Sequence, residues 1–300
     1  MNAIATSPST SRVARKMLNK VPEVTVYFWL IKVLCTTVGE TAADYLSTNV
    51  GWGANTTMIA TGGLLVALLA AQFSVKRYIA PIYWACVVVI SVFGTQITDK
   101  LTDTYNVPLT TTTPVFAAIL ALVFAAWYAT ERTLSIHSIF TVRREAFYWL
   151  AILFTFALGT AAGDLVAEKF TLGYAVSVGL FAGVIAVVAV AHFRFGLNAV
   201  LSFWLAYIMT RPLGASIGDF MSQNDPQAGG MNLGTTATSY IFLGLILVMV
   251  AYLQVTKRDR TPTEVIAAEL AHERDHAPHG QPRHHRQHPR GRSELASQEG

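Results

Sequence analysis

Charged residues are scarce in this chain of 300 residues. Asp, Glu, Lys and Arg make up 13% of it, whereas about 25% is usual in soluble domains. Hydrophobic residues make up 53%. The net charge of +4 gathers in short loops and at the chain ends and forms no basic face, so we expect no nucleic-acid partner. The composition predicts an integral membrane protein whose surroundings are the lipid bilayer.

Cysteine is nearly absent as well. Cys35 and Cys86 lie inside apolar segments and match no metal-binding or redox spacing, so we interpret both as small core residues. The sequence also lacks a glycine-rich phosphate-binding loop, a His-Glu zinc motif and a nucleophile elbow. We therefore expect neither enzymatic activity nor a cofactor.

Eight apolar stretches are each long enough to cross a hydrocarbon core of about 30 Å as a helix. Together these stretches predict an all-α polytopic fold with a membrane domain at 23–255. Polar sequence on either side predicts a basic tail at 1–22 and a disordered tail at 256–300. The predicted helices are Val24–Leu46, Thr56–Phe73, Ile79–Leu101, Leu109–Ala129, Ala146–Ala167, Leu172–Phe193, Ala199–Met221 and Thr235–Val255.

Basic residues occupy every second connection between these stretches. The alternate connections hold only Lys100 and Lys169, beside acidic residues. By the positive-inside rule the basic set is cytoplasmic, and an even number of spans then places both termini in the cytoplasm. The basic set between the spans comprises Lys76, Arg77, Arg132, Arg143, Arg144 and Arg194.

A two-helix repeat occurs four times, at about 24–75, 79–130, 144–194 and 199–255. In each copy the first helix carries a tryptophan, a glycine ten residues later and an aspartate five residues after that. Because each copy crosses the membrane twice, all four have the same orientation and should be related by rotation about the membrane normal. The motif residues are Trp29, Gly39, Asp44; Trp84, Gly94, Asp99; Trp149, Gly159, Asp164; and Trp204, Gly214, Asp219.

The motif, together with Arg211-Pro212-Leu213-Gly214, resembles a family of uncharacterised bacterial inner-membrane proteins built from four tandem two-helix repeats. The resemblance covers roughly residues 24–255. It implies the eight-helix fold and an inner-membrane location, and it assigns no function to the repeat.

Position along the helix gives each motif residue an expected role. The tryptophans fall near the cytoplasmic interface and are expected to anchor the protein among the headgroups. The glycines fall deeper and are expected to allow close helix packing. The aspartates either cap the helix ends, bonded to the Asn and Thr residues of the following helix, or line one outward-facing vestibule with their carboxylates.

Three charges break the fourfold pattern. Glu40 stands four residues before Asp44, on the same helix face. Arg211 lies near the bilayer midplane, where an unpaired guanidinium costs at least about 2.5–3.5 kcal/mol, so we predict a carboxylate partner, either Glu40 or an aspartate. Such a pair is equally compatible with a structural bridge and with a polar transport site. Lys32 is shallower and is expected to extend to the cytoplasmic face.

The C-terminal tail is rich in histidine. His272, His276, His284 and His285 are candidate metal ligands. No fixed ligand spacing appears among them, and a solvated tail with incidental histidines explains them equally simply.

Two functions of different classes follow from these features. The first is a secondary transporter or channel-like carrier of a small cation, either a divalent metal or a proton-coupled substrate, using Asp44, Asp99, Asp164, Asp219, Glu40 and Arg211. The second is a membrane scaffold or sensor that acts through its cytoplasmic tail. The oligomeric state is not encoded in any motif that we recognise.

Overall fold

The computed structural model describes residues 19–48, 51, 53–224 and 229–260, which contain eight long helices and three short helical turns. The long helices agree with the eight predicted apolar stretches to within a few residues. They are α2 (Val26–Thr48), α3 (Gly53–Ser74), α4 (Ala80–Asp99), α5 (Leu109–Glu131), α6 (Val142–Asp164), α7 (Tyr174–Phe195), α8 (Ala199–Ser222) and α9 (Thr235–Thr256).

Local sequence sets where these helices begin and end. The Asn198 side chain accepts hydrogen bonds from the amides of Val200 and Leu201, and Thr141 caps the start of α6 by accepting from the Arg144 amide. Gly196 ends α7 in the left-handed region at φ 72°, a conformation that glycine adopts without strain.

Seven of the eight described long helices are long and apolar enough to cross a membrane. The exception is α2, in which Lys32, Glu40 and Asp44 interrupt the apolar sequence. Its 23 residues still span about 35 Å. The chain is therefore an all-helical protein with membrane-type helices built from four repeats.

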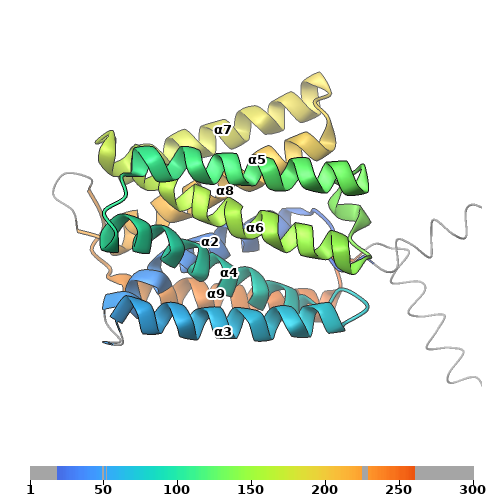
Figure 1. The fold of residues 1–300 in the computed structure, drawn as a ribbon, viewed down its shortest axis with the longest axis horizontal. Coiled ribbons are helices and arrows are strands. Elements are labelled where there is room, and N and C mark those ends of the chain that lie inside the picture. Colours follow the sequence, from blue (N-terminus) through green and yellow to red (C-terminus); the bar gives the residue numbers. More distant parts are fainter. Residues whose placement is uncertain (1–18, 49–50, 52, 225–228, 261–300) are drawn as a thin grey trace, which may run out of the picture.

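The four helices that carry the motif, α2, α4, α6 and α8, form the inner bundle, and the other four lie outside them (Figure 1). Each outer helix packs mainly on the motif helix of the next repeat: α3 on α4, α5 on α6, α7 on α8, and α9 on α2. The apolar windows of α4, α6 and α8 are 56–61% buried, whereas those of the outer helices are each 22% buried. The outer helices thus present the apolar surface that a bilayer would cover.

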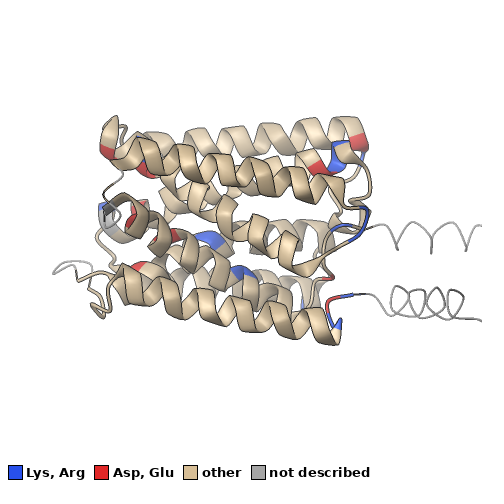
Figure 2. Cartoon of the chain, turned by 90° about the horizontal axis from the view of Figure 1, so that it is seen from below, with Lys and Arg blue, Asp and Glu red and all other residues tan. Residues whose placement is uncertain are grey.

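The two ends of the bundle differ in charge (Figure 2). We call the end with the connections at 75–79, 132–141 and 196–198 and the segment 257–260 the basic end. The acidic end is the one at which the motif aspartates lie. The Glu23 amide donates to the Asp259 carbonyl at 3.0 Å, so the first and last described segments meet at the basic end.

Two motif helices change their winding directly after the motif aspartate. Beyond Asp99, α4 continues as a π-helical turn, η1 (Lys100–Thr104), and beyond Asp164, α6 continues as η3 (Leu165–Lys169). Short π segments are frequent at functional sites. Both of these lie at the acidic end.

Candidate functional site at the bundle axis

The motif glycines join the four inner helices into a closed ring. A Cβ atom added to any of them would overlap the residue seven positions after the tryptophan in the next motif helix. The glycines therefore permit close helix packing, as the sequence predicted. The contacts are Gly39 on Ser91, Gly94 on Phe156, Gly159 on Arg211 and Gly214 on Thr36.

Because the last contact returns from the fourth repeat to the first, the repeats are arranged by rotation, in agreement with the prediction from the sequence. Equivalent motif positions consequently form layers along one axis. Four such layers, counted from the basic end, are completely or almost completely buried. They are Phe28, Tyr83, Tyr148 and Phe203; Lys32, Val87, Ile152 and Tyr207; Thr36, Ser91, Phe156 and Arg211; and Glu40, Thr95, Thr160 and Ala215.

Arg211, in the fourth repeat, forms hydrogen bonds with residues of all three other repeats. Its side chain is fully buried, and one terminal nitrogen donates to Glu40 Oε2 at 2.9 Å, to Thr160 Oγ1 at 2.6 Å and to Thr95 Oγ1. The other terminal nitrogen donates to the Thr36 carbonyl at 3.2 Å. The predicted partner Glu40 is thus confirmed.

The three side chains bonded to that nitrogen occupy one motif position in three repeats, directly after the glycine. Only the fourth repeat has an apolar residue there, Ala215. The small side chain of Ala215 leaves room beside the axis for the Arg211 guanidinium, which belongs to the same helix one turn earlier.

Carboxylates gather at the acidic end of the same axis. Oxygens of Glu40, Asp164 and Asp219, from three different repeats, lie within 4.8 Å of one another. Asp99 interacts with the like charges of Glu40, Asp164 and Asp44. Carboxylate oxygens in this number suit a hard cation such as Mg²⁺, Ca²⁺ or Mn²⁺.

The fourth motif aspartate has a partner of its own. Asp44 is half-buried and accepts a hydrogen bond from Gln223 Nε2 at 3.0 Å. Of the four motif aspartates, Asp164 and Asp219 thus have oxygens within 4.8 Å of a Glu40 oxygen.

Lys32 lies in the protein interior, and the prediction that it extends to the cytoplasmic face is wrong. Its side chain is fully buried, and Nζ lies 4.2 Å from the centroid of the Phe156 ring and 4.1 Å from that of Tyr207. The two rings are nearly parallel, with an interplanar angle of 16° and centroids 6.5 Å apart. Because α2 belongs to the inner bundle, neighbouring helices close the route to the headgroups.

The tryptophans also pack inside the protein. Trp84, Trp149 and Trp204 are 1–4% exposed, so a headgroup-anchoring role is wrong for these three; Trp29 is half-buried. Trp204 Nε1 donates to the Leu134 carbonyl at 2.9 Å. A tryptophan near a helix end can pack against other helices as well as lie at a lipid interface. These three lie on inner helices, so other helices surround them.

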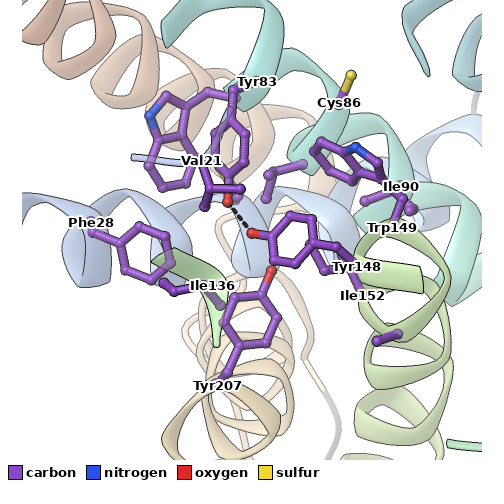
Figure 3. Close-up of a cluster of buried hydrophobic side chains, with 14 of the residues drawn as sticks. Val21, Phe28, Tyr83, Cys86, Ile90, Ile136, Tyr148, Trp149, Ile152 and Tyr207 are labelled. Carbon is purple, nitrogen blue, oxygen red and sulfur yellow. Dashed lines mark hydrogen bonds between the residues drawn. The ribbon is translucent and has the colours of Figure 1, made fainter. Parts of the chain in front are cut away.

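The residues before the tryptophans close the axis toward the basic end. Tyr83 and Tyr148 share a hydrogen bond of 2.5 Å between their hydroxyls, and Figure 3 shows the Tyr207 hydroxyl pointing toward the same place. Val21 lies in the same buried cluster. Aromatic rings and one apolar side chain therefore fill this part of the axis.

The described part of the N-terminal segment is packed onto the basic end. Lys20 Nζ donates to Glu145 Oε2 at 2.7 Å and to the Phe73 carbonyl at 3.1 Å, while Gln72 Nε2 donates to Glu145 Oε1 at 3.2 Å. Glu145 is 1% exposed. We did not identify this network in the sequence, although a single acid directly after Arg143 and Arg144 was a signal for it.

Two further predictions have different outcomes. Cys35 and Cys86 are free and buried, as expected of small core residues. The candidate metal ligands His272, His276, His284 and His285 lie outside the described residues, as does most of the tail.

The repeat predicted from the sequence is also recognised by comparison with known families. A family described as Repeat of Unknown Function (DUF347) matches four times, at residues 27–78, 82–133, 147–197 and 202–259. No curated protein and no solved structure matches the chain. Because the four matches cover most of its length, the chain belongs to the DUF347 repeat family.

Proposed function

We propose that this protein is a membrane carrier of a small cation, with a divalent metal as the best fit. The observation that carries the proposal is the convergence of Glu40, Asp164 and Asp219 from three repeats within 4.8 Å. The positive-inside rule puts the acidic end outside, and both chain ends in the cytoplasm of a bacterial inner membrane. The cluster then faces the side from which a cation would enter.

Charge balance favours a bound cation at this cluster. Arg211 neutralises one carboxylate, Glu40, and the motif aspartates add further negative charge around it. Like charges at this spacing repel each other strongly where water is restricted. A divalent ion would offset that repulsion, and oxygen donors of this kind are its ordinary ligands.

The Glu40–Arg211 pair lies between the carboxylates and the aromatic part of the axis. A cation moving inward must displace Arg211 from Glu40 or pass beside it. Pro212 lies next to the arginine inside α8 and cannot donate a backbone hydrogen bond, which weakens the helix at that point. We therefore infer that movement of α8 at Arg211 opens the path.

Binding of Mn²⁺ to the purified protein tests the proposal. We expect Glu40→Gln and Asp219→Asn to weaken Mn²⁺ binding at least tenfold, which corresponds to about 1.4 kcal/mol. Asp103→Asn, which changes an exposed acid in the turn after Asp99, is the matched control and should bind as the wild type does. Proteoliposomes with an entrapped metal-sensitive dye then report uptake.

Equal Mn²⁺ affinity in all three variants, or no measurable binding by a folded wild-type protein, would reject a cation site at the axis. In that case a membrane scaffold or sensor becomes the better-supported function. One observation favours it: the axis is closed toward the basic end by buried aromatic side chains. A groove of about 670 Å³ lies near that end, between α2, α7 and α8, and none of the motif carboxylates lines it.

A further inference from the structure

Lys32 is a buried amine without a carboxylate partner. Its exposure is 0%, and Nζ has no hydrogen-bond acceptor among the described residues. The rings of Phe156 and Tyr207 on either side stabilise its charge through their π faces. Unlike an ion pair, this setting leaves the ammonium without a fixed counter-charge.

Among the described residues, the layer of Lys32 contains no other charge, and the neighbouring helices supply one other cation in the next layer. The same layer contains Val87, Ile152 and Tyr207, from α4, α6 and α8, and Cys35 is the nearest titratable group on α2 itself. The outer helices α3 and α9, which also contact α2, contain no charged residue.

The other cation is Arg211, one layer nearer the acidic end. Both cations lie against the Phe156 ring, with Lys32 Nζ 4.2 Å and Arg211 Cζ 5.9 Å from its centroid. The two charges are therefore at most about 10 Å apart, a separation at which they interact strongly inside a protein.

Glu40 screens this repulsion, because it pairs with Arg211. A cation bound to Glu40, Asp164 and Asp219 competes for the same carboxylate. Once Glu40 ligates the cation, the positive potential at Lys32 rises. A guanidinium stays protonated under these conditions, whereas an amine can give up its proton.

We propose that Lys32 is the proton-exchanging group of the axis, so that a cation bound at the carboxylate cluster releases a proton from the Lys32 ammonium. This inference rests on the proposed cation site and adds its coupling. In the step one N–H bond breaks and the electron pair remains on nitrogen as the neutral amine. Each hydroxyl that accepts a proton gives up its own to the next group, and water at the basic end takes the last proton.

The acceptor side of this step is the row of tyrosine hydroxyls toward the basic end. The Tyr207 hydroxyl is buried without a hydrogen-bond partner among the described residues, and it points toward the bonded pair Tyr83 and Tyr148. A hydroxyl both accepts and donates a proton. The proton therefore leaves toward the basic end while the cation enters from the acidic end, so both move in the same direction along the axis.

Calorimetric titration of Mn²⁺ in two buffers of different ionisation enthalpy, Tris and PIPES at one neutral pH, counts the protons released on binding. We expect the wild type to release about one proton more per bound Mn²⁺ than Lys32→Met or Lys32→Arg does. The Met variant has no charge to lose, and the Arg variant keeps its charge. Thermal unfolding identifies which variants are folded.

The outcomes separate the two proposals. If the wild type binds Mn²⁺ but releases the same number of protons as a folded Lys32 variant, the coupling through Lys32 is wrong and the cation site stands. If the wild type does not bind Mn²⁺, the cation site fails and the coupling fails with it. In proteoliposomes, the correct coupling gives Mn²⁺-driven proton movement that both variants lose.

Discussion

The Arg211 guanidinium donates a hydrogen bond to Glu40 Oε2 across 2.9 Å, which ties the fourth repeat to the first by charge. Both side chains lie in the protein interior, with side-chain exposures of 0% and 7%. Charged pairs in such surroundings are strongly sensitive to the loss of one partner, because the other remains buried and uncompensated.

We therefore expect Arg211→Ala to lower the free energy of unfolding by about 3–5 kcal/mol. The double variant Arg211→Ala, Glu40→Gln should recover much of this loss, because no carboxylate is then left without a partner at that layer. Thermal unfolding in detergent measures both effects. Strictly additive losses in the double variant would show that the pair contributes nothing as a pair.

The ring of glycine contacts gives a second prediction. Gly159→Ala places a methyl group on Arg211 and Pro212, and overpacking of this kind costs about 1–3 kcal/mol. Gly179→Ala, in α7, is the matched control, because a Cβ there meets nothing within 4 Å. The control should leave thermal stability unchanged or raise it, and equal losses in the two variants would contradict the ring packing.

The network at the basic end gives a third prediction. Lys20→Met leaves the Glu145 carboxylate, which is 1% exposed, without its cation, so we expect a loss of about 3–5 kcal/mol. Addition of Glu145→Gln should restore most of it. If Lys20→Met is as stable as the wild type, the segment around Lys20 is not held in place by this ion pair.

The fourth prediction concerns the pH dependence of stability. Burial raises the pKa of Asp259, which follows α9 at the basic end. The folded protein thus holds this proton more tightly than the unfolded chain does. The stability penalty of ionising Asp259 is absent below the ordinary carboxyl pKa of about 4 and grows as the pH rises through the raised pKa.

Asp259→Asn removes this penalty without changing the size of the side chain. We expect the variant to unfold at a higher temperature than the wild type at neutral pH, and the difference to vanish in acid. Asp103→Asn, at an exposed position, should show no such trend. A difference that grows toward acid pH would have the wrong sign for a raised pKa.

The fifth prediction separates the tail from the bundle. Removal of residues 261–300 should leave insertion and thermal stability unchanged, because this segment lacks the apolar periodicity of the helices. Truncation after Lys257 also removes Asp259, whose backbone carbonyl accepts from the Glu23 amide. We therefore expect the shorter chain to be less stable, and membrane fractionation with thermal unfolding tests both truncations.

The helices and their repeat could be predicted from the sequence because both depend on local pattern. Apolar length defines each helix, and the spacing of tryptophan, glycine and aspartate aligns the copies. Even the pairing of Arg211 followed from depth alone, since a midplane guanidinium needs a carboxylate. The prediction that Gly39, Gly94, Gly159 and Gly214 serve packing holds for the same local reason.

What could not be predicted was the direction in which a side chain points. Trp84 and Lys32 have depths that suit a lipid interface, but their helices lie inside the bundle, where other helices replace the lipid. Likewise, Lys20 and Glu145 are separated by 125 positions in the sequence, and no local pattern brings them together. The sequence predicts how far along its helix each residue lies, whereas the packing of the four inner helices determines which residues it contacts.

That ring also fixes how many copies of the repeat the protein can have. Open arrays of repeats lengthen one unit at a time and need capping units at both ends. Here Gly214 packs on Thr36 as Gly39 packs on Ser91, so the fourth contact between repeats returns to the first repeat and closes the ring. A fifth copy would find its place already occupied by the first, and a third without a fourth would leave the axis open to lipid.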